Sequence, residues 1–114
     1  MLGYAGDVAT DLATRTIFAT DNSIYEARPA AVLYPRDPED LNRIVRAAAT
    51  AGVAVVARGG GTGTNGQSLT ESVVVDCSRH LNRILSLDPE AGTAVVEPGV
   101  ILDQLNTEAA KHGM

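Results

Sequence analysis

A run of ten residues rich in glycine, RGGGTGTNGQ at positions 58–67, constrains the fold of this chain more than any other feature. It directly follows an apolar run at 53–57. Glycine allows positive φ angles and lets a ligand approach the backbone closely. Successive N–H groups in such turns form a concave site that binds anions. The pattern therefore predicts a loop at the end of a strand that holds a phosphate or pyrophosphate.

The charge around this loop favours an anionic ligand. The chain has a formal net charge of −5, yet no Asp or Glu lies between Leu41 and Thr70, where Arg43, Arg46 and Arg58 are found. A locally basic segment in an acidic chain suits an anion better than a cation. The overall acidity and the 4% aromatic content argue against nucleic-acid binding.

Apolar runs and capping residues predict an α/β (α+β) fold: a small, mainly parallel three-stranded sheet with flanking helices plus a hairpin. A helix is expected to start at Asp37, which caps a proline and two acids, and to end at Gly52. A further helix is expected over Asp7 to Phe18, with Asp7 as its cap. The strands are expected at 30–34, 53–57 and 73–75, the hairpin at 84–97, and the last helix at 101–109.

Three interpretations of the loop compete. Gly61, Gly63 and Gly66 satisfy the dinucleotide pattern G-x-G-x-x-G, but the next strand follows too soon for the helix that this motif opens. Residues 61–68 have P-loop spacing, but Gln67 stands where the phosphate-binding lysine belongs. A plain flexible turn remains the alternative to a phosphate site.

The remaining polar residues suggest no catalytic or metal site. The single cysteine, Cys77, excludes an internal disulfide, fits a reducing cytoplasmic setting and is interpreted as a core residue. His80 and His112 lie far apart without partners at metal-ligand spacing. No apolar run approaches the roughly 20 residues that span a bilayer, and no signal peptide is visible. A cytoplasmic location is therefore expected.

Four segments resemble, in the same order, the PCMH-type (vanillyl-alcohol-oxidase-like) FAD-binding domain. They are PRDPEDL at 35–41, the glycine loop at 58–67, VDCSRHLNRI at 75–84 and VEPGV at 96–100. With TDNSIY at 20–25, the wording is most similar to the D-lactate and D-2-hydroxyglutarate dehydrogenase branch of the FAD-linked oxidases. The resemblance covers about residues 20–113.

This resemblance implies that 29–114 form the first subdomain of an FAD-binding domain, preceded by an N-terminal helix and lead-in loop at 1–28. Some relatives attach the flavin through a loop histidine; none occurs at 58–67, so the FAD is expected to be non-covalent. The segment 98–100 is expected near the adenine side. The cofactor-binding residues implied are Arg58, Gly59, Gly60, Gly61, Thr62, Gly63, Thr64, Asn65, Gly66, Gln67, Pro98, Gly99 and Val100.

The resemblance also implies a flavin-linked oxidoreductase that oxidises a D-2-hydroxy acid by hydride transfer to FAD. The catalytic groups, and any iron–sulfur segment, are expected beyond Met114, so the 114-residue chain is expected to be inactive alone. Membrane association of a longer parent enzyme and a homodimer are further options. The alternative function is a stand-alone phosphate-ligand or regulatory binding module without redox activity.

Overall fold

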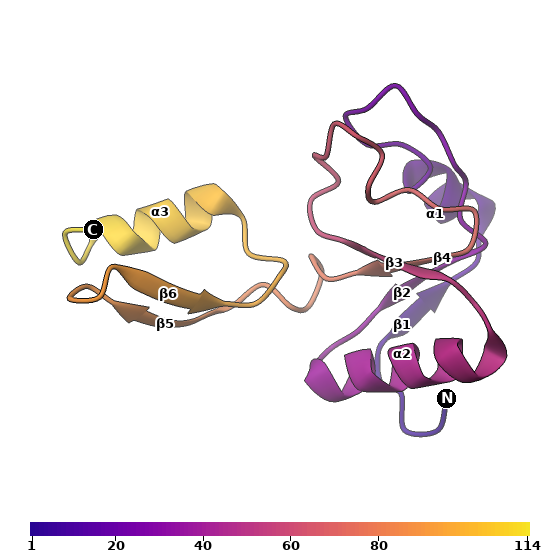
Figure 1. Cartoon of the computed structure of the whole chain (residues 1–114), viewed down its shortest axis with the longest axis horizontal. Coiled ribbons are helices and arrows are strands. Elements are labelled where there is room, and N and C mark those ends of the chain that lie inside the picture. Colours follow the sequence, from indigo (N-terminus) through magenta and orange to yellow (C-terminus); the bar gives the residue numbers. More distant parts are fainter.

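A computed structural model describes all residues, 1–114, as three helices and six strands in two sheets (Figure 1). The larger sheet has the strand order β1-β2-β4-β3, in which β2, β4 and β3 are parallel and β1 runs antiparallel to β2. Its strands are β1 (Asp7–Ala9), β2 (Ala31–Tyr34), β3 (Val55–Arg58) and β4 (Val73–Asp76). The predicted α/β class and mainly parallel sheet are confirmed, and β1 adds a fourth strand.

β4 lies in the middle of the three parallel strands, and its side chains reach the core on both faces. Val74 and, on β2, Val32 are fully buried, and they pack with Tyr34 on one face. On the other face, Val75 packs with Leu33 and with three further residues, Ile44, Cys77 and Leu81. This two-sided burial explains why the strands read as continuous apolar runs.

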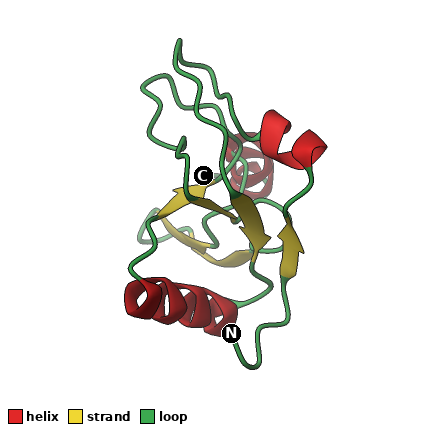
Figure 2. Cartoon of the chain, turned by 90° about the vertical axis from the view of Figure 1, so that its right-hand side faces the viewer, coloured by secondary structure: helices red, strands yellow, loops and turns green.

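α2 (Pro38–Ala51) covers one face of the sheet, opposite α1 and the long loops (Figure 2). Its predicted ends are confirmed. The carboxylate of Asp37 accepts a hydrogen bond from the Asp40 N–H at 2.8 Å, with Pro38 in the first turn. Gly52 ends the helix at φ 67°, a left-handed conformation that favours glycine.

The helix predicted over Asp7 to Phe18 is wrong in its first part. Residues Asp7–Ala9 form β1, and α1 is confined to Leu12–Ile17. Asp11, not Asp7, is the N-cap: its carboxylate accepts from the Thr14 N–H at 2.9 Å. The exposed edge of β2 offers backbone partners to residues 7–9, and this tertiary pairing overrides the local helix signal.

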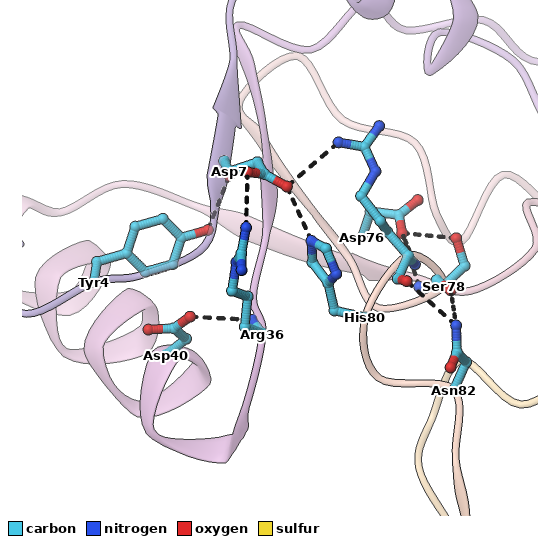
Figure 3. Close-up of polar contacts among 9 residues, drawn as sticks. Tyr4, Asp7, Arg36, Asp40, Asp76, Ser78, His80 and Asn82 are labelled. Atoms are coloured by element: carbon cyan, nitrogen blue, oxygen red, sulfur yellow. Dashed lines mark hydrogen bonds and ion pairs between the residues drawn. The ribbon is translucent and has the colours of Figure 1, made fainter.

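The carboxylate of Asp7 instead ties β1 to the turn after β4 (Figure 3). It lies 2.9 Å from Nε2 of His80 and 3.6 Å from the guanidinium of Arg79, while Arg36 is at 3.7 Å. Arg79 also lies over the Tyr34 ring, 3.6 Å from its centre. Hydrogen bonding to His80, followed by the charge of Arg36, lowers the pKa of Asp7.

Asp7→Asn is expected to lower the melting temperature in a pH-dependent way. Because the folded pKa of Asp7 is depressed, its contribution is fully present above the unfolded pKa of about 4 and is lost as the pH falls through the folded value. The melting temperatures of the variant and the wild type should therefore differ more at pH 6 than at pH 3. Asp103→Asn, at an exposed aspartate without an ion pair, is the control. An equal difference at both pH values would contradict a role for the Asp7 charge.

β5 (Ile84–Asp88) and β6 (Thr93–Val96) form the predicted hairpin, which with α3 (Leu102–Ala110) extends as a separate lobe (Figure 1). The Asp88 carboxylate accepts the N–H groups of Glu90 and Ala91 in the turn. The radius of gyration is 15.7 Å, against about 13 Å for a compact chain of this length. No residue of α3 is buried. The lobe therefore contributes little to the core.

None of the three helices combines the length and the apolar composition required to cross a membrane.

Candidate functional site

The glycine loop is the crossover between two neighbouring parallel strands. Residues 59–72 join the end of β3 to the start of β4, and no helix lies between them. Parallel neighbours need a connection of about a dozen residues or more, which is usually helical. The missing helix confirms the rejection of the Rossmann and P-loop interpretations. The loop leaves the carboxyl end of β3, the edge at which open α/β sheets bind ligands.

The backbone N–H groups of this loop are left without partners in the chain. None of the N–H groups of residues 59–64 donates a hydrogen bond to backbone or side chain. Gly61 and Gly66 have positive φ angles of 68° and 72°, which bend the loop. The Asn65 N–H donates to the Gln67 side chain at 3.1 Å, and Leu69 N–H donates to the Gly66 carbonyl. The loop thus has unpaired N–H donors at 59–64 and internal hydrogen bonds at 65–69. A row of unpaired backbone donors of this kind suits a bound anion.

The carbonyl groups of the loop, in contrast, are held by the segment at 20–23. The Asn22 N–H donates to the Gly63 carbonyl at 3.0 Å, and its side-chain amide donates to the Thr62 carbonyl at 3.4 Å. No local sequence pattern predicts this contact, because it joins segments about forty residues apart. These two hydrogen bonds hold the glycine-rich loop against the segment at 20–23.

Arg58 is part of the same brace. Its guanidinium donates to the carbonyl of Thr20 at 2.9 Å and to that of Phe18 at 3.5 Å, and it lies over the Phe18 ring. Asp21 is brought close as well: hydrogen bonding to Ser23, aided by the charge of Arg58, lowers its pKa. The sequence has no acid between residues 41 and 70, but the fold places the carboxylate of Asp21 close to Arg58.

Two hollows adjoin the loop. The smaller, of about 250 Å³, is lined by Arg58, Gly59, Gly60, Gly61, Thr62, Gly63, Gln67 and Ser68, together with Ala57. The larger is a groove of about 650 Å³ lined by Gly60, Thr62, Ser78, Asn82, Pro98, Gly99, Val100, Ile101, Leu102 and Gln104. Gly60 and Thr62 belong to both, so the two hollows meet at the loop. The structure thus brings 98–100 to the glycine loop, whereas Thr64, Asn65 and Gly66 line neither hollow.

The turn after β4, whose polar contacts are drawn in Figure 3, contributes Ser78 and Asn82 to the wall of the groove. The Asp76 carboxylate accepts from the N–H and the hydroxyl of Ser78, at 2.8 and 2.7 Å, and so organises the turn. The side-chain amide of Asn82 donates to the Ser78 carbonyl at 2.9 Å. Gly99 N–H donates to the carbonyl of Leu81 at 2.7 Å, which fixes the 98–100 segment against this turn. Ser78, Asn82 and Gln104 line the groove but are not among the cofactor-binding residues expected from the sequence.

The cysteine and the two histidines considered in the sequence lie outside the two hollows at the loop. Cys77 is buried in the core, as predicted, and burial raises the pKa of its thiol. Neither His80 nor His112 lines the hollow or the groove at the loop. No group of three or more His, Cys, Asp or Glu residues could hold a metal ion. Arg83 forms an ion pair with Glu97 at 2.8 Å.

Residues 29–114 match the family described as the FAD binding domain. The chain is 50% identical over 107 residues to D-2-hydroxyglutarate dehydrogenase of Escherichia coli, covering 91% of this chain and 10% of the relative. It is 45% identical over 115 residues to the enzyme of the same name from Pseudomonas putida, covering 98% and 11%. The chain therefore spans about a tenth of the length of these relatives.

Solved structures agree with this assignment. 6-Hydroxy-D-nicotine oxidase from Arthrobacter nicotinovorans superimposes with a TM-score of 0.81 at 28% identity, over 99% of this chain and 25% of that one. p-Cresol methylhydroxylase has the same fold, with a TM-score of 0.79 at 19% identity over 93% and 22%. The family match extends over 29–114, which includes the loop, the turn after β4 and the 98–100 segment. This chain belongs to the FAD binding domain family.

Proposed function

We propose that the glycine loop binds the pyrophosphate of FAD through its backbone. The observation that carries this proposal is the row of unpaired N–H groups at residues 59–64, most of which line the 250 Å³ hollow. Backbone donors of this kind suit the oxygens of a phosphate or pyrophosphate, because they supply positive partial charge without a side chain. The hydroxyl of Thr62 adds a side-chain donor at the same place.

The larger groove then accepts the adenosine side of the cofactor. Its volume of about 650 Å³ lies within the range typical of small-molecule sites, about 300–1,000 Å³. It begins at Gly60 and Thr62 and runs along 98–102, so that a dinucleotide held at the loop can continue into it. The lack of a histidine in residues 58–67 supports non-covalent binding.

We further propose that the protein acts as an FAD-dependent oxidoreductase on a D-2-hydroxy acid. The support is the 50% identity to an enzyme named D-2-hydroxyglutarate dehydrogenase. Bound FAD supplies a flavin that accepts a hydride; this chain's own residues bind and orient the phosphate and adenosine end. No catalytic group is assigned within 1–114, and 29–114 would form the first subdomain of the cofactor domain. The cytoplasmic location and the homodimer stay predictions.

Gly60→Val is expected to weaken FAD binding by about tenfold or more while the chain stays folded, which corresponds to about 1.4 kcal/mol. A Cβ at Gly60 meets only the Thr62 methyl group, at 3.7 Å, and Gly60 has no positive φ angle. The new side chain therefore fits the protein but occupies space where the hollow and the groove meet. Titration of FAD followed by fluorescence, with circular dichroism of each variant, measures both effects.

Gly92→Ala is the matched control, because Gly92 lies in the hairpin turn away from the loop. At φ 66° an alanine is strained and should cost about 1 kcal/mol of stability without changing FAD affinity. Gly60→Val should show the reverse pattern. Equal FAD affinity of Gly60→Val and wild type would contradict the proposed location, and a wild-type chain that fails to bind FAD would contradict the function.

A further inference from the structure

Ser68 carries a buried hydroxyl that nothing in the chain satisfies. The residue is only 8% exposed, and its Oγ is shielded from solvent without a hydrogen-bond partner. A buried hydroxyl left without a partner costs roughly 1–3 kcal/mol, and natural proteins contain few such groups. The position of Ser68 therefore calls for a functional reason.

Ser68 belongs to the wall of the hollow beside the glycine loop. Ser68 lines this hollow together with residues 58–63 and Gln67. Two other polar side chains there already have partners: Arg58 donates to the carbonyl of Thr20, and Oε1 of Gln67 accepts from the Asn65 N–H. Ser68 thus offers a buried side-chain donor that is not committed elsewhere, beside the unpaired N–H groups of 59–64.

The chemistry of the hollow selects an anion as the partner of Ser68. A serine hydroxyl donates one hydrogen bond and accepts two, while its neighbours in the loop are backbone donors. A group surrounded by donors must supply acceptors, and phosphate oxygens do so with charge-assisted strength. The second buried atom without a partner, Oδ2 of Asp21, can only accept when ionised, and Asp21 does not line this hollow.

We propose that the Ser68 Oγ–H donates a hydrogen bond to a phosphate oxygen of the ligand held in the hollow at residues 58–63. The inference rests on the proposed function and adds one side-chain donor to its backbone site. Ser68 stands immediately after the predicted loop, and it positions the phosphate without taking part in redox chemistry.

Ser68→Ala is expected to weaken the binding of FAD and of ADP by about tenfold or more, the usual range for a bond to a charged group. Riboflavin, which lacks phosphate, should bind both proteins equally. The melting temperature without ligand should be unchanged or higher, because the unsatisfied hydroxyl is gone. Calorimetric titration with the three probes, and thermal denaturation, measure these effects on the chain.

Two variants make the result decisive. Ser68→Cys keeps nearly the same volume but replaces the hydroxyl by a weak donor, and should show the same loss for FAD and ADP. Ser86→Ala, at an exposed serine of β5, should change nothing. A lower melting temperature of Ser68→Ala, with equal losses for all three probes, would overturn the inference in favour of a structural serine.

The failure of this inference can be told apart from failure of the proposed function. If Gly60→Val weakens FAD binding and Ser68→Ala does not, the loop site stands and only the role of Ser68 falls. That result would mean that the hydroxyl pairs with a buried water instead. If the wild-type chain binds neither FAD nor ADP, the proposed function fails and this inference fails with it.

Discussion

Asp40→Ala is expected to lower the free energy of unfolding by about 3 kcal/mol, the largest effect on stability anticipated for a single polar residue. The Asp40 side chain is completely buried at the start of α2. It accepts hydrogen bonds from the N–H groups of Ala5 and Arg36, each at 3.0 Å, and lies 3.4 Å from the guanidinium of Arg43. Alanine would leave the two backbone donors without their acceptor.

The electrostatics of Asp40 support this expectation. Burial is the largest single influence and raises its pKa, but the bonds from Ala5 and Arg36 and the guanidinium of Arg43 act in the opposite direction, and the net effect is a lowered pKa of Asp40. The carboxylate is therefore held in its charged form by the protein around it. By accepting backbone hydrogen bonds from both Ala5 and Arg36, the Asp40 side chain also joins residues 1–6 to the connection between β2 and α2.

Urea denaturation followed by circular dichroism tests the prediction. Glu39→Ala is the matched control, since Glu39 is the exposed neighbour in the same first turn and interacts only with the helix dipole. It should cost less than about 1 kcal/mol. Asp40→Asn keeps one acceptor oxygen and should fall between the two. If Asp40→Ala and Glu39→Ala cost the same, the buried hydrogen bonds do not stabilise the fold.

Gly99→Ala is expected to cost about 3 kcal/mol of stability and to weaken FAD binding with it. A Cβ at this buried position would overlap the backbone carbonyl groups of Cys77 and Leu81. Backbone atoms cannot give way by a change of rotamer, so the 98–100 segment would have to move away from the turn after β4. That movement would break the Gly99 N–H to Leu81 carbonyl bond and open the groove wall.

Gly60→Ala provides the contrast within the same site. Its Cβ meets nothing closer than 3.7 Å, so the free energy of unfolding should change by no more than about 1 kcal/mol. Chemical denaturation of both variants separates a glycine required by packing from a glycine that leaves room for a ligand. Equal stability of Gly99→Ala and wild type would show that the turn after β4 adapts, and that the close approach at Gly99 is not needed.

The parts of the fold that sequence predicts well are those with local causes. Asp37, Pro38 and Gly52 define α2 through capping and backbone preferences that act within a few residues. β2 and β4 are buried on both faces, so they require apolar runs. β1 has no such cause. It is three residues long, Val8 is 56% exposed, and only the edge of β2 makes it a strand.

The site shows the same division. The glycine loop is recognisable from its own residues, and the position of 98–100 beside it follows from the family resemblance. The bracing by Asn22 and the engagement of Arg58 with the carbonyl of Thr20 depend on contacts between distant segments. Ser68 carries no local signal either, because its importance comes from burial without a partner.

The central position of β4 links the ligand loop to the cooperativity of the whole sheet. β2 and β3 do not pair with each other; both pair with β4, which comes last of the four strands in the chain. The sheet therefore closes only after residues 59–72 have crossed back over it. A ligand that orders this crossover stabilises the native state by mass action, by about 2.7 kcal/mol at one hundred times its dissociation constant. Cofactor binding and the stability of the sheet are therefore thermodynamically linked, and we expect the loaded chain to resist the global opening that exposes the amides of β4 to hydrogen exchange.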